Sequence, residues 1–389
     1  MPSPPISLAL GRTADPPIPA ARQWAAKYRG QAGPMIDLTQ AVPGYPPHAT
    51  LLERMAHEAG QRANATYGLI DGEVALREAL AENLTQFYQS PLGAADFAIT
   101  AGCNLAFAMA MTVLSGQRAE ILLPTPWYFN HQMAMTMQRI TAVPLPCLAE
   151  NGFIPNPDHA AARITENTRA IVLVSPNNPT GAITPPETIA RFAELCRTHA
   201  LWLILDETYR DFLPASALPP HDVFADPDWR DYVIHLYSFS KAYCVPGHRV
   251  GAIAAGPTFR HELMKVLDTM QICAPRAAQA ALTWAIPALK DWRRDNRTLM
   301  QSRAAAFDRA MAGAPGWEIN AIGGYFAYLR TPRAAPEAIE TAERLAAEHG
   351  LLTLPGPFFG PGQERYIRLA FANVDDDAIA AIPGRLNGF

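Results

Sequence analysis

Residues 201–209 read LWLILDETY, so five apolar residues run directly into the acidic pair Asp206 and Glu207. An apolar run of this length is typical of a strand that is buried on both faces of a parallel sheet. Similar runs lie at 170–174 and 232–236, and a helical spacing of apolar residues lies at 189–196. Strand, helix and strand at these spacings predict βαβ units and a mostly parallel sheet flanked by helices.

The same alternation of predicted strands and helices continues upstream of this central stretch. Downstream of it, the pattern of predicted elements changes. The periodicity predicts strands at 35–39, 97–100 and 120–123, and helices at about 50–63, from about 72 onward and at 105–114. Beyond about residue 290, a predicted helix at 336–349 alternates with Gly/Pro-rich turns and short strands at 325–329 and 366–370. We therefore expect an α/β protein with a large sheet domain and a smaller α+β domain.

The N-terminal 20 residues are rich in proline, with Pro16, Pro17 and Pro19 close together. Such a segment favours an extended arm over a helix. We expect this arm to lie against the C-terminal region, which makes the smaller domain discontinuous. The predicted boundaries are 1–48 for the arm and part of the small domain, 49–288 for the large domain and 289–389 for the rest of the small domain.

Composition excludes several classes of protein. Hydrophobic residues make up 49% of the 389 residues, and charged residues make up 17%. The hydrophobic share is enough for a large core and too high for a disordered chain. The 32 basic and 36 acidic residues give a net charge of −4, without the basic excess that nucleic-acid binding usually needs. No membrane-length apolar run and no secretory leader pattern is present.

Five cysteines are scattered singly, and no CxxC pair occurs. This arrangement argues against a disulfide framework and against a structural zinc site, and the histidines show no metal-binding spacing. We therefore predict a soluble, cytoplasmic protein without a metal site.

Polar residues follow several of the predicted strands at the point where each strand ends. They are the segments 100–104, 175–181, 206–209 and 237–241. Ligands of open α/β sheets bind outside the carboxyl ends of the strands, so these segments are expected to face one crevice. The crevice would hold a helix start, an Asn, an Asp, a Tyr, a Ser and a Lys.

These residue types match the functional groups of one cofactor. A lysine can form a Schiff base with an aldehyde, and a buried aspartate can pair with a protonated ring nitrogen. Helix-start amides, a serine hydroxyl and an arginine can hold a phosphate. An aldehyde, a pyridinium nitrogen and a phosphate together describe pyridoxal phosphate.

The motifs that carry this set also resemble a known family, the class I and II aminotransferases, which are fold-type-I pyridoxal-phosphate enzymes. The similarity is to the subgroup of bacterial aspartate and kynurenine aminotransferases, and it runs from about Asp37 to about Phe371. Its landmarks, in order, are Tyr67-x4-Gly72-x3-Leu76-Arg77, Thr100-x-Gly102, Pro126-Trp127-Tyr128, Asn177-Asn178-Pro179-Thr180-Gly181, Asp206-Glu207-Thr208-Tyr209, Ser238-x2-Lys241-x7-Arg249-x-Gly251 and Tyr366-Ile367-Arg368.

The resemblance implies a role for individual residues. Lys241 forms the Schiff base and moves the proton, Asp206 pairs with the ring nitrogen, and Tyr209 is the third catalytic residue. The implied cofactor-binding residues are Tyr67, Gly102, Cys103, Asn104, Tyr128, Asn178, Asp206, Tyr209, Ser238, Lys241 and Arg249. The implied substrate-binding residues are Arg368, Asn178 and Ala41. The guanidinium of Arg368 would bind the α-carboxylate through two parallel hydrogen bonds. Tyr67 would reach the neighbouring subunit, which implies a homodimer with a shared active site.

The chain departs from the family pattern near the substrate. Ala41 stands where many relatives have Gly, and Cys103 and Asn104 stand where relatives often have Gly followed by an aromatic residue or a Lys. In aspartate-preferring relatives that Lys reads the distal carboxylate, and Asn104 lacks its charge. This difference argues against a specialist for dicarboxylates.

The predicted function is therefore a ping-pong aminotransferase, which moves the amino group of an L-α-amino acid to a 2-oxo acid through the Lys241 Schiff base. A carbon–sulfur β-lyase, a synthase or a cyclase on the same scaffold stays open as the alternative, because one carbanion has several fates. A non-catalytic regulator is a third reading. Such regulators usually carry a DNA-binding domain, for which the sequence shows no candidate before residue 20.

Overall fold

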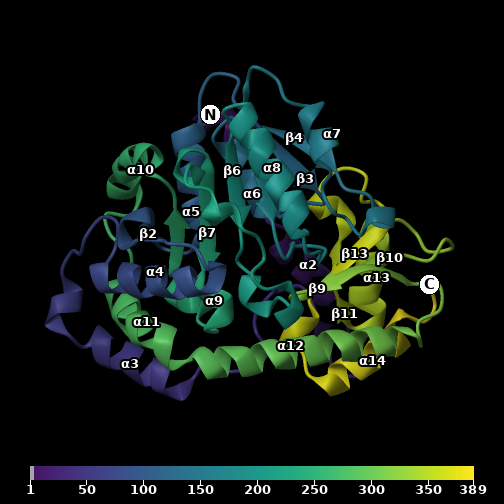
Figure 1. Ribbon diagram of the computed structural model, residues 1–389. Helices are drawn as coiled ribbons and strands as arrows, with labels where there is room; N and C mark the ends of the chain where they lie inside the picture. The colour runs from purple at the N-terminus through teal and green to yellow at the C-terminus, as the bar shows by residue number, and fades with distance from the viewer. Residues whose placement is uncertain (1–3) are drawn as a thin grey trace.

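The computed structural model describes residues 4–389, and its centre is a seven-stranded sheet (Figure 1). The strand order across this sheet is β2-β8-β7-β6-β5-β3-β4. The strands are β2 (Phe97–Thr100), β3 (Glu120–Thr125), β4 (Thr141–Pro146), β5 (Thr168–Val174), β6 (Trp202–Asp206), β7 (Val233–Ser238) and β8 (Gly251–Ala254). Only β8 runs against its neighbours, so the predicted mostly parallel sheet is confirmed.

Helices cover both faces of this sheet, because alternate residues of each strand point to opposite sides. In β6, Leu203 and Leu205 join one apolar cluster, whereas Ile204 joins the other. The helices of the large layer are α3 (Ala49–Ala59), α4 (Val74–Tyr88), α5 (Cys103–Leu114), α6 (Phe129–Met137), α7 (Pro157–Ala161), α8 (Pro186–Thr198), α9 (Phe239–Ala242), α10 (Pro257–Met270) and α11 (Arg276–Ala288).

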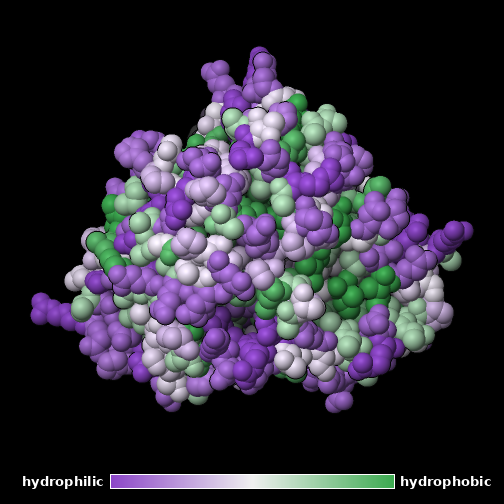
Figure 2. Space-filling model, viewed as in Figure 1, coloured by the Kyte–Doolittle hydropathy of each residue, from purple (hydrophilic) through white to green (hydrophobic). Residues whose placement is uncertain are grey.

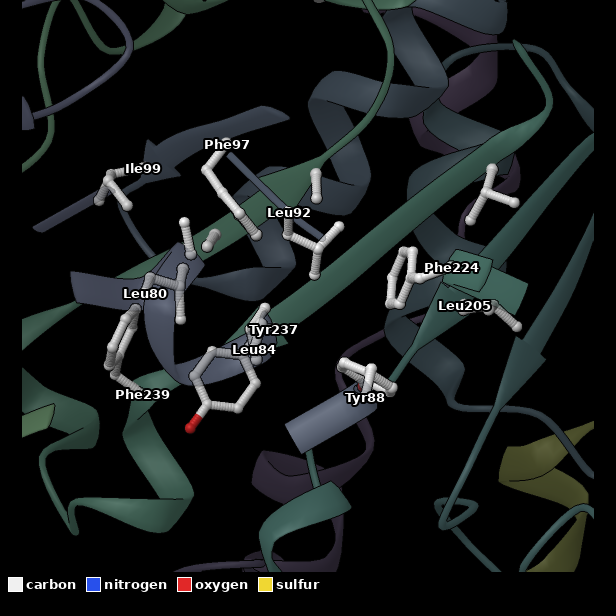
Figure 3. Packing of buried hydrophobic residues seen from close by; sticks show 14 of the residues in the cluster. Leu80, Leu84, Tyr88, Leu92, Phe97, Ile99, Leu205, Phe224, Tyr237 and Phe239 are labelled. Carbon is white, nitrogen blue, oxygen red and sulfur yellow. The ribbon is translucent and has the colours of Figure 1, made fainter. Parts of the chain in front are cut away.

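The two faces have different coverings. Helices α3, α4, α8 and α11 supply the cluster that contains Leu205, and Figure 3 shows Leu80, Leu84 and Tyr88 of α4 lying over the strand residues there. Helices α5, α6 and α10 supply the cluster on the opposite face. A sheet buried on both sides explains why its strands read as continuous apolar runs.

A second layer is formed by the C-terminal part of the chain. A four-stranded antiparallel sheet has the order β12-β13-β10-β9. Its strands are β9 (Glu318–Gly323), β10 (Phe326–Arg330), β12 (Leu354–Pro355) and β13 (Tyr366–Leu369). The accompanying helices are α12 (Lys290–Met311), α13 (Ala338–His349) and α14 (Asp376–Leu386). The 22-residue α12 runs along the base of the molecule and joins the two layers (Figure 1).

The N-terminal segment lies against this second layer. Strand β1 (Ile36–Asp37) pairs in parallel with β11 (Leu351–Leu352). The expectation of an extended arm is wrong over much of residues 4–20, because α1 (Leu8–Arg12) and α2 (Pro17–Ala25) are helical. Proline is tolerated in the first turn of a helix, where its missing N–H has no intrahelical acceptor, and Pro17 occupies that first turn. Residues 1–3 of the predicted arm lie outside the described residues.

The described residues, 4–389, contain no helix that is both long and apolar enough to cross a membrane. Within the same range, no group of three or more His, Cys, Asp or Glu side chains is placed to hold a metal ion.

Candidate active site

A cavity of about 280 Å³ lies at the carboxyl ends of the central strands, where the two layers meet. It brings together most of the residues that the sequence singled out. Those that line it are Ala41, Cys103, Asn104, Tyr128, Asn178, Asp206, Tyr209, Ser238, Lys241, Arg249 and Arg368. Its size is near the lower end of small-molecule pockets, which begin at about 300 Å³.

Lys241 is in the short helix α9, which follows directly on β7. Its Nζ donates a hydrogen bond to the carbonyl oxygen of Ala41 at 2.5 Å, and it takes part in no ion pair within residues 4–389. Burial, together with the positive charges of Arg249 and Arg368, lowers the pKa of Lys241 to about 8. A fraction of the amine is therefore unprotonated near neutral pH, which a nucleophilic lysine requires.

Asp206 is the last residue of β6 and is 5% exposed. Its carboxylate contacts Nε2 of His131 at 3.1 Å and accepts a hydrogen bond from the Thr208 amide at 3.0 Å. Burial alone would raise the pKa of Asp206, but these contacts with His131 and Thr208 outweigh it and lower the pKa. The carboxylate therefore stays ionised inside the cavity.

His131 is a residue that the sequence reasoning did not select. It is in the first turn of α6, and its ring stacks on Phe107 with the centroids 3.9 Å apart. The sequence did offer a signal, since His131 lies three residues after Tyr128 and so follows it by about one helical turn. The partner of His131 could not be predicted, because Asp206 is 75 residues away in the chain.

Arg368 is in β13 and is 2% exposed. It donates hydrogen bonds to Oδ1 of Asn178 at 3.0 Å and to the carbonyl oxygen of Thr39, and its Nε has no partner. Burial lowers the pKa of Arg368 to about 10, so the guanidinium stays charged at neutral pH. Within residues 4–389, Arg368 forms no ion pair with a carboxylate. A buried cation without a counter-ion is costly, and an anionic ligand would relieve that cost.

The other end of the cavity has the geometry of an anion cradle. Helix α5 begins at Cys103, so the amides of Cys103 and Asn104 have no acceptor within the helix. Gly102, with φ +95°, precedes them, and a Cβ there would collide with the guanidinium of Arg249. Ser238, at the end of β7, also lines this part of the cavity. Amides, a hydroxyl and a guanidinium around a helix start are suited to a phosphate.

Two tyrosines and an asparagine also line the cavity. Burial raises the pKa of Tyr128 and of Tyr209, so both phenols keep their protons. The Tyr209 ring lies 6.0 Å from Nζ of Lys241, and the hydroxyl of Tyr128 accepts a hydrogen bond from Asn130. Asn178 is buried beside Arg368. These groups offer hydrogen-bond donors between the lysine and the guanidinium.

Two predicted site residues are not part of the lining. Gly102 is immediately beside the cavity, since a Cβ there would meet the guanidinium of Arg249, which lines it. Tyr67 is 79% exposed and does not line this chain's own cavity. Thr208 and Ser240, from two of the segments that were expected to face the crevice, also line it. The cavity further includes residues that the sequence did not indicate, which are Ile18, Thr39, Gln40, Val42, Phe129, Val174 and Pro246.

A family model and two relatives all indicate the same family of proteins. A model of the family described as aminotransferase class I and II matches residues 33–386. The aromatic aminotransferase ISS1 of Arabidopsis thaliana is 26% identical, over 96% of this chain and 94% of that protein. The arginine–pyruvate transaminase AruH of Pseudomonas aeruginosa is 29% identical, over 90% of each chain.

A solved structure has the same fold. The aspartate aminotransferase from Thermus thermophilus with maleate superposes with a TM-score of 0.89 at 22% identity. The superposition covers 98% of this chain and 99% of that one. The α/β fold with a large parallel sheet and a smaller antiparallel one is therefore the fold-type-I aminotransferase architecture.

Proposed function

The chain belongs to the class I and II aminotransferases, which depend on pyridoxal phosphate, and from this premise we propose that it transfers the amino group of an L-α-amino acid to a 2-oxo acid. The transfer takes place in two half-reactions at the cavity that contains Lys241. The observation that carries the proposal is the placement of three groups in one cavity: a lysine of lowered pKa, an ionised aspartate and an arginine without a counter-ion. A β-lyase is not favoured, because the relatives compared above are named as aminotransferases or transaminases.

The residues of the cavity are suited to pyridoxal phosphate. The anion cradle of Cys103, Asn104, Ser238 and Arg249 would hold the phosphate, and Asp206 would hold the ring nitrogen. The unpartnered Nε of Arg368 leaves a donor for a ligand, and the absence of a side chain at Gly102 lets the Arg249 guanidinium approach the start of α5. When bound, the cofactor supplies an aldehyde for a lysine amine and a ring that accepts the electron pair of a Cα–H bond.

The chain's own residues then perform three tasks. Asp206, kept ionised by His131, would hold a proton at the ring nitrogen and so maintain positive charge there. Lys241 would bind the aldehyde carbon and, once displaced by the substrate's amine, carry a proton to and from the substrate Cα. Its lowered pKa suits that role, since a general base works best with a pKa near the ambient pH.

Hydrogen bonds around the cofactor and substrate come from the remaining groups. Tyr209 and Asn178 would donate to the phenolic oxygen of the cofactor, and Tyr128 would cover the ring. Arg368 would bind the α-carboxylate that amino acids and 2-oxo acids share, with Asn178 holding its fork in place. Ala41 would lie beside that carboxylate, since it lines the cavity two residues after Thr39, whose carbonyl accepts a hydrogen bond from Arg368.

The lining favours substrates with uncharged side chains. Ile18, Val42 and Phe129 contribute apolar surface, and Asn104 is neutral. Among the cavity residues of the described chain, the cations are Lys241, Arg249 and Arg368, and each already has a task in the proposal. A distal carboxylate would therefore find no counter-ion on this chain.

We also propose a cytoplasmic homodimer in which Tyr67 reaches the second subunit's cofactor. Tyr67 and its neighbour Leu69 are exposed, as are Met270 and Ile272. Both segments lie beside the end of β2, since Ile99 bonds to Asp71 and Ala101 bonds to Gln271. An exposed apolar surface next to the cradle is suited to a subunit interface. The boundaries 1–48, 49–288 and 289–389 stay a prediction, with the cofactor in the middle range.

The test is a visible absorption spectrum of the purified protein with added pyridoxal phosphate. We expect a yellow protein whose colour is bleached by particular L-amino acids without an oxo acid, and restored by 2-oxoglutarate. Lys241→Ala should lose turnover completely, whereas Lys265→Ala, which removes an exposed lysine, should retain it. Substantial turnover in Lys241→Ala would overturn the proposal, and ammonia and pyruvate released from cystathionine without an acceptor would establish the β-lyase instead.

A further inference from the structure

A second cavity, of about 340 Å³, lies where the C-terminal end of α4 meets the first turns of α12. It is separate from the site described above and shares no lining residue with it. Its lining residues are Asn83, Gln86, Phe87, Gln89, Asp211, Leu218, Pro219, Lys290, Arg293, Arg294 and Arg297. Four of these are cations and one is an acid.

The four cations share one face of α12. Lys290, Arg293, Arg294 and Arg297 are three, four and seven residues apart, which is the spacing of neighbours on a helix surface. Like charges at these spacings repel and destabilise a helix. Along the base of the molecule, where α12 runs, hydrophilic residues are interspersed with less polar ones (Figure 2).

The protein's own acids satisfy only part of this charge. Arg293 contacts Asp211 at 2.9 Å, and Arg294 contacts Asp291 at 2.6 Å and Asp295 at 3.3 Å. Lys290 and Arg297 have neither an ion-pair partner nor a side-chain hydrogen bond within residues 4–389. The C-terminal end of α4 carries a partial negative charge, which offsets about half an elementary charge of the cluster's positive charge. Two cations therefore remain without partners.

One of the cations is rigidly held and incompletely bonded. The Arg293 side chain is 10% exposed, its Nη2 donates to the Ile286 carbonyl at 3.2 Å, and its Nε has no partner. Its partner Asp211 is fixed in turn by a hydrogen bond from the Tyr237 hydroxyl at 2.8 Å. This wall of the cavity is therefore formed before any ligand arrives.

The remaining wall offers neutral donors and an apolar floor. Asn83, Gln86 and Gln89 of the α4 end present side-chain amides, and Gln86 has one long hydrogen bond to Glu82 at 3.5 Å. Phe87, Leu218 and Pro219 provide apolar surface. Cations and amide donors over an apolar floor suit an anion that carries a small organic group.

We propose that this cavity is a binding site for a small organic polyanion, either a phosphate ester or a polycarboxylate. Lys290 and Arg297 supply the uncompensated charge, Arg293 supplies a fixed guanidinium, and the amides of the α4 end complete the donor set. The inference goes beyond the transaminase activity and does not depend on it, because no residue of this cavity has a task in the proposed reaction.

The test is isothermal titration of the pyridoxal-phosphate-loaded protein with inorganic phosphate and, separately, with tricarballylate at constant ionic strength. Loading fills the phosphate cradle of the first site. We expect saturable binding of one equivalent of at least one anion, and the anion that binds distinguishes the two ligand sources. The absence of saturable binding for both anions would overturn the proposal.

Variants locate the bound anion. Lys290→Gln with Arg297→Gln should weaken binding at least tenfold, whereas Lys265→Gln with Arg309→Gln, an equal charge change elsewhere, should not. Arg368→Ala should also retain binding; binding lost only in that variant would place the anion in the first site and contradict the inference. Because repulsion is removed, the Lys290 and Arg297 double variant should melt at the same or a higher temperature. A lower melting temperature would mean that these cations already have partners.

Discussion

Asp206 and Glu207 are consecutive carboxylates, yet they lie in opposite environments. Asp206 lines the cavity and has two partners, His131 and Thr208. Glu207 is 1% exposed and points to the other side of the sheet, where it contacts His221 at 3.3 Å, His235 at 2.9 Å and the Tyr88 hydroxyl. Tyr88 and Phe224, both labelled in Figure 3, close this side with aromatic rings.

Burial and a lowered pKa therefore do not by themselves identify a carboxylate that takes part in catalysis. Burial would raise the pKa of both carboxylates, and nearby histidines lower it in both. What differs is the space beside each group, since Asp206 faces a cavity and Glu207 faces packed side chains. We therefore expect substitution of Asp206 to affect the reaction and substitution of Glu207 to affect stability.

The largest effect is expected for Asp206→Asn. This isosteric change removes the charge that would hold a proton on the cofactor, and loss of one such electrostatic contact costs roughly 10²–10³-fold in rate. The rate of bleaching by the preferred amino acid, followed by stopped-flow absorbance, measures it. If Glu207→Gln slows the reaction as much as Asp206→Asn does, the contrast between the two carboxylates is wrong.

Glu207→Gln should instead lower the free energy of unfolding by about 3 kcal/mol, because it breaks a buried charged contact with two histidines. Urea denaturation of the cofactor-free protein measures this loss. The bleaching rate of the folded variant should stay within a few-fold of the wild type. A variant as stable as the wild type would mean that this buried carboxylate contributes nothing to the fold.

Arg368→Ala tests the side of the sheet that Asp206 faces, because it removes a buried cation from the same cavity. It should raise KM about 30-fold for both the amino acid and the 2-oxo acid, which corresponds to about 2 kcal/mol, because a charged hydrogen bond to the shared carboxylate is lost. Arg330→Ala, an exposed arginine in the adjacent strand β10, is the matched control. An unchanged KM would place the carboxylate elsewhere.

The pH dependence of stability gives the smallest effect. The pKa of Lys241 is about 8 in the fold against an ordinary 10.5, so between these values the unfolded chain binds more protons and stability rises with pH. From pH 8 to 9.5 the cofactor-free wild type should gain about 1.5 kcal/mol relative to Lys241→Met, which has no group to titrate. Parallel curves for the two proteins would show that the pKa is not lowered.

Much of the fold was predictable, because its central strands are buried on both faces. The run at 201–205 and its two companions correspond to β6, β5 and β7, and the predicted strand at 97–100 is β2. Alternation along a strand also predicts that Asp206 and Glu207 point to opposite faces. The helices that cover each side of the sheet decide which of these two carboxylates points into a cavity. Local sequence does not contain that information.

The parts of the site that were missed depend on contacts between distant segments. His131 reaches Asp206 from another helix, and its value as a partner appears only once α6 lies beside β6. Ile18 lines the cavity because α2 is helical and lies against α13, whereas the proline content indicated an extended arm. The roles of the predicted residues stay predictions until the variants above are measured.

The hydrogen bond from Lys241 to Ala41, and that from Arg368 to Thr39, join residues that are far apart in the order of synthesis. Thr39 and Ala41 leave the ribosome long before Arg368, so a nascent chain holds half of the pocket without the other half. An incomplete chain that stops before β13 would contain Lys241 but not Arg368, the residue proposed to bind the carboxylate. Translation must therefore pass residue 368 before the lining of the cavity is complete, which ties the proposed activity to completion of the second layer.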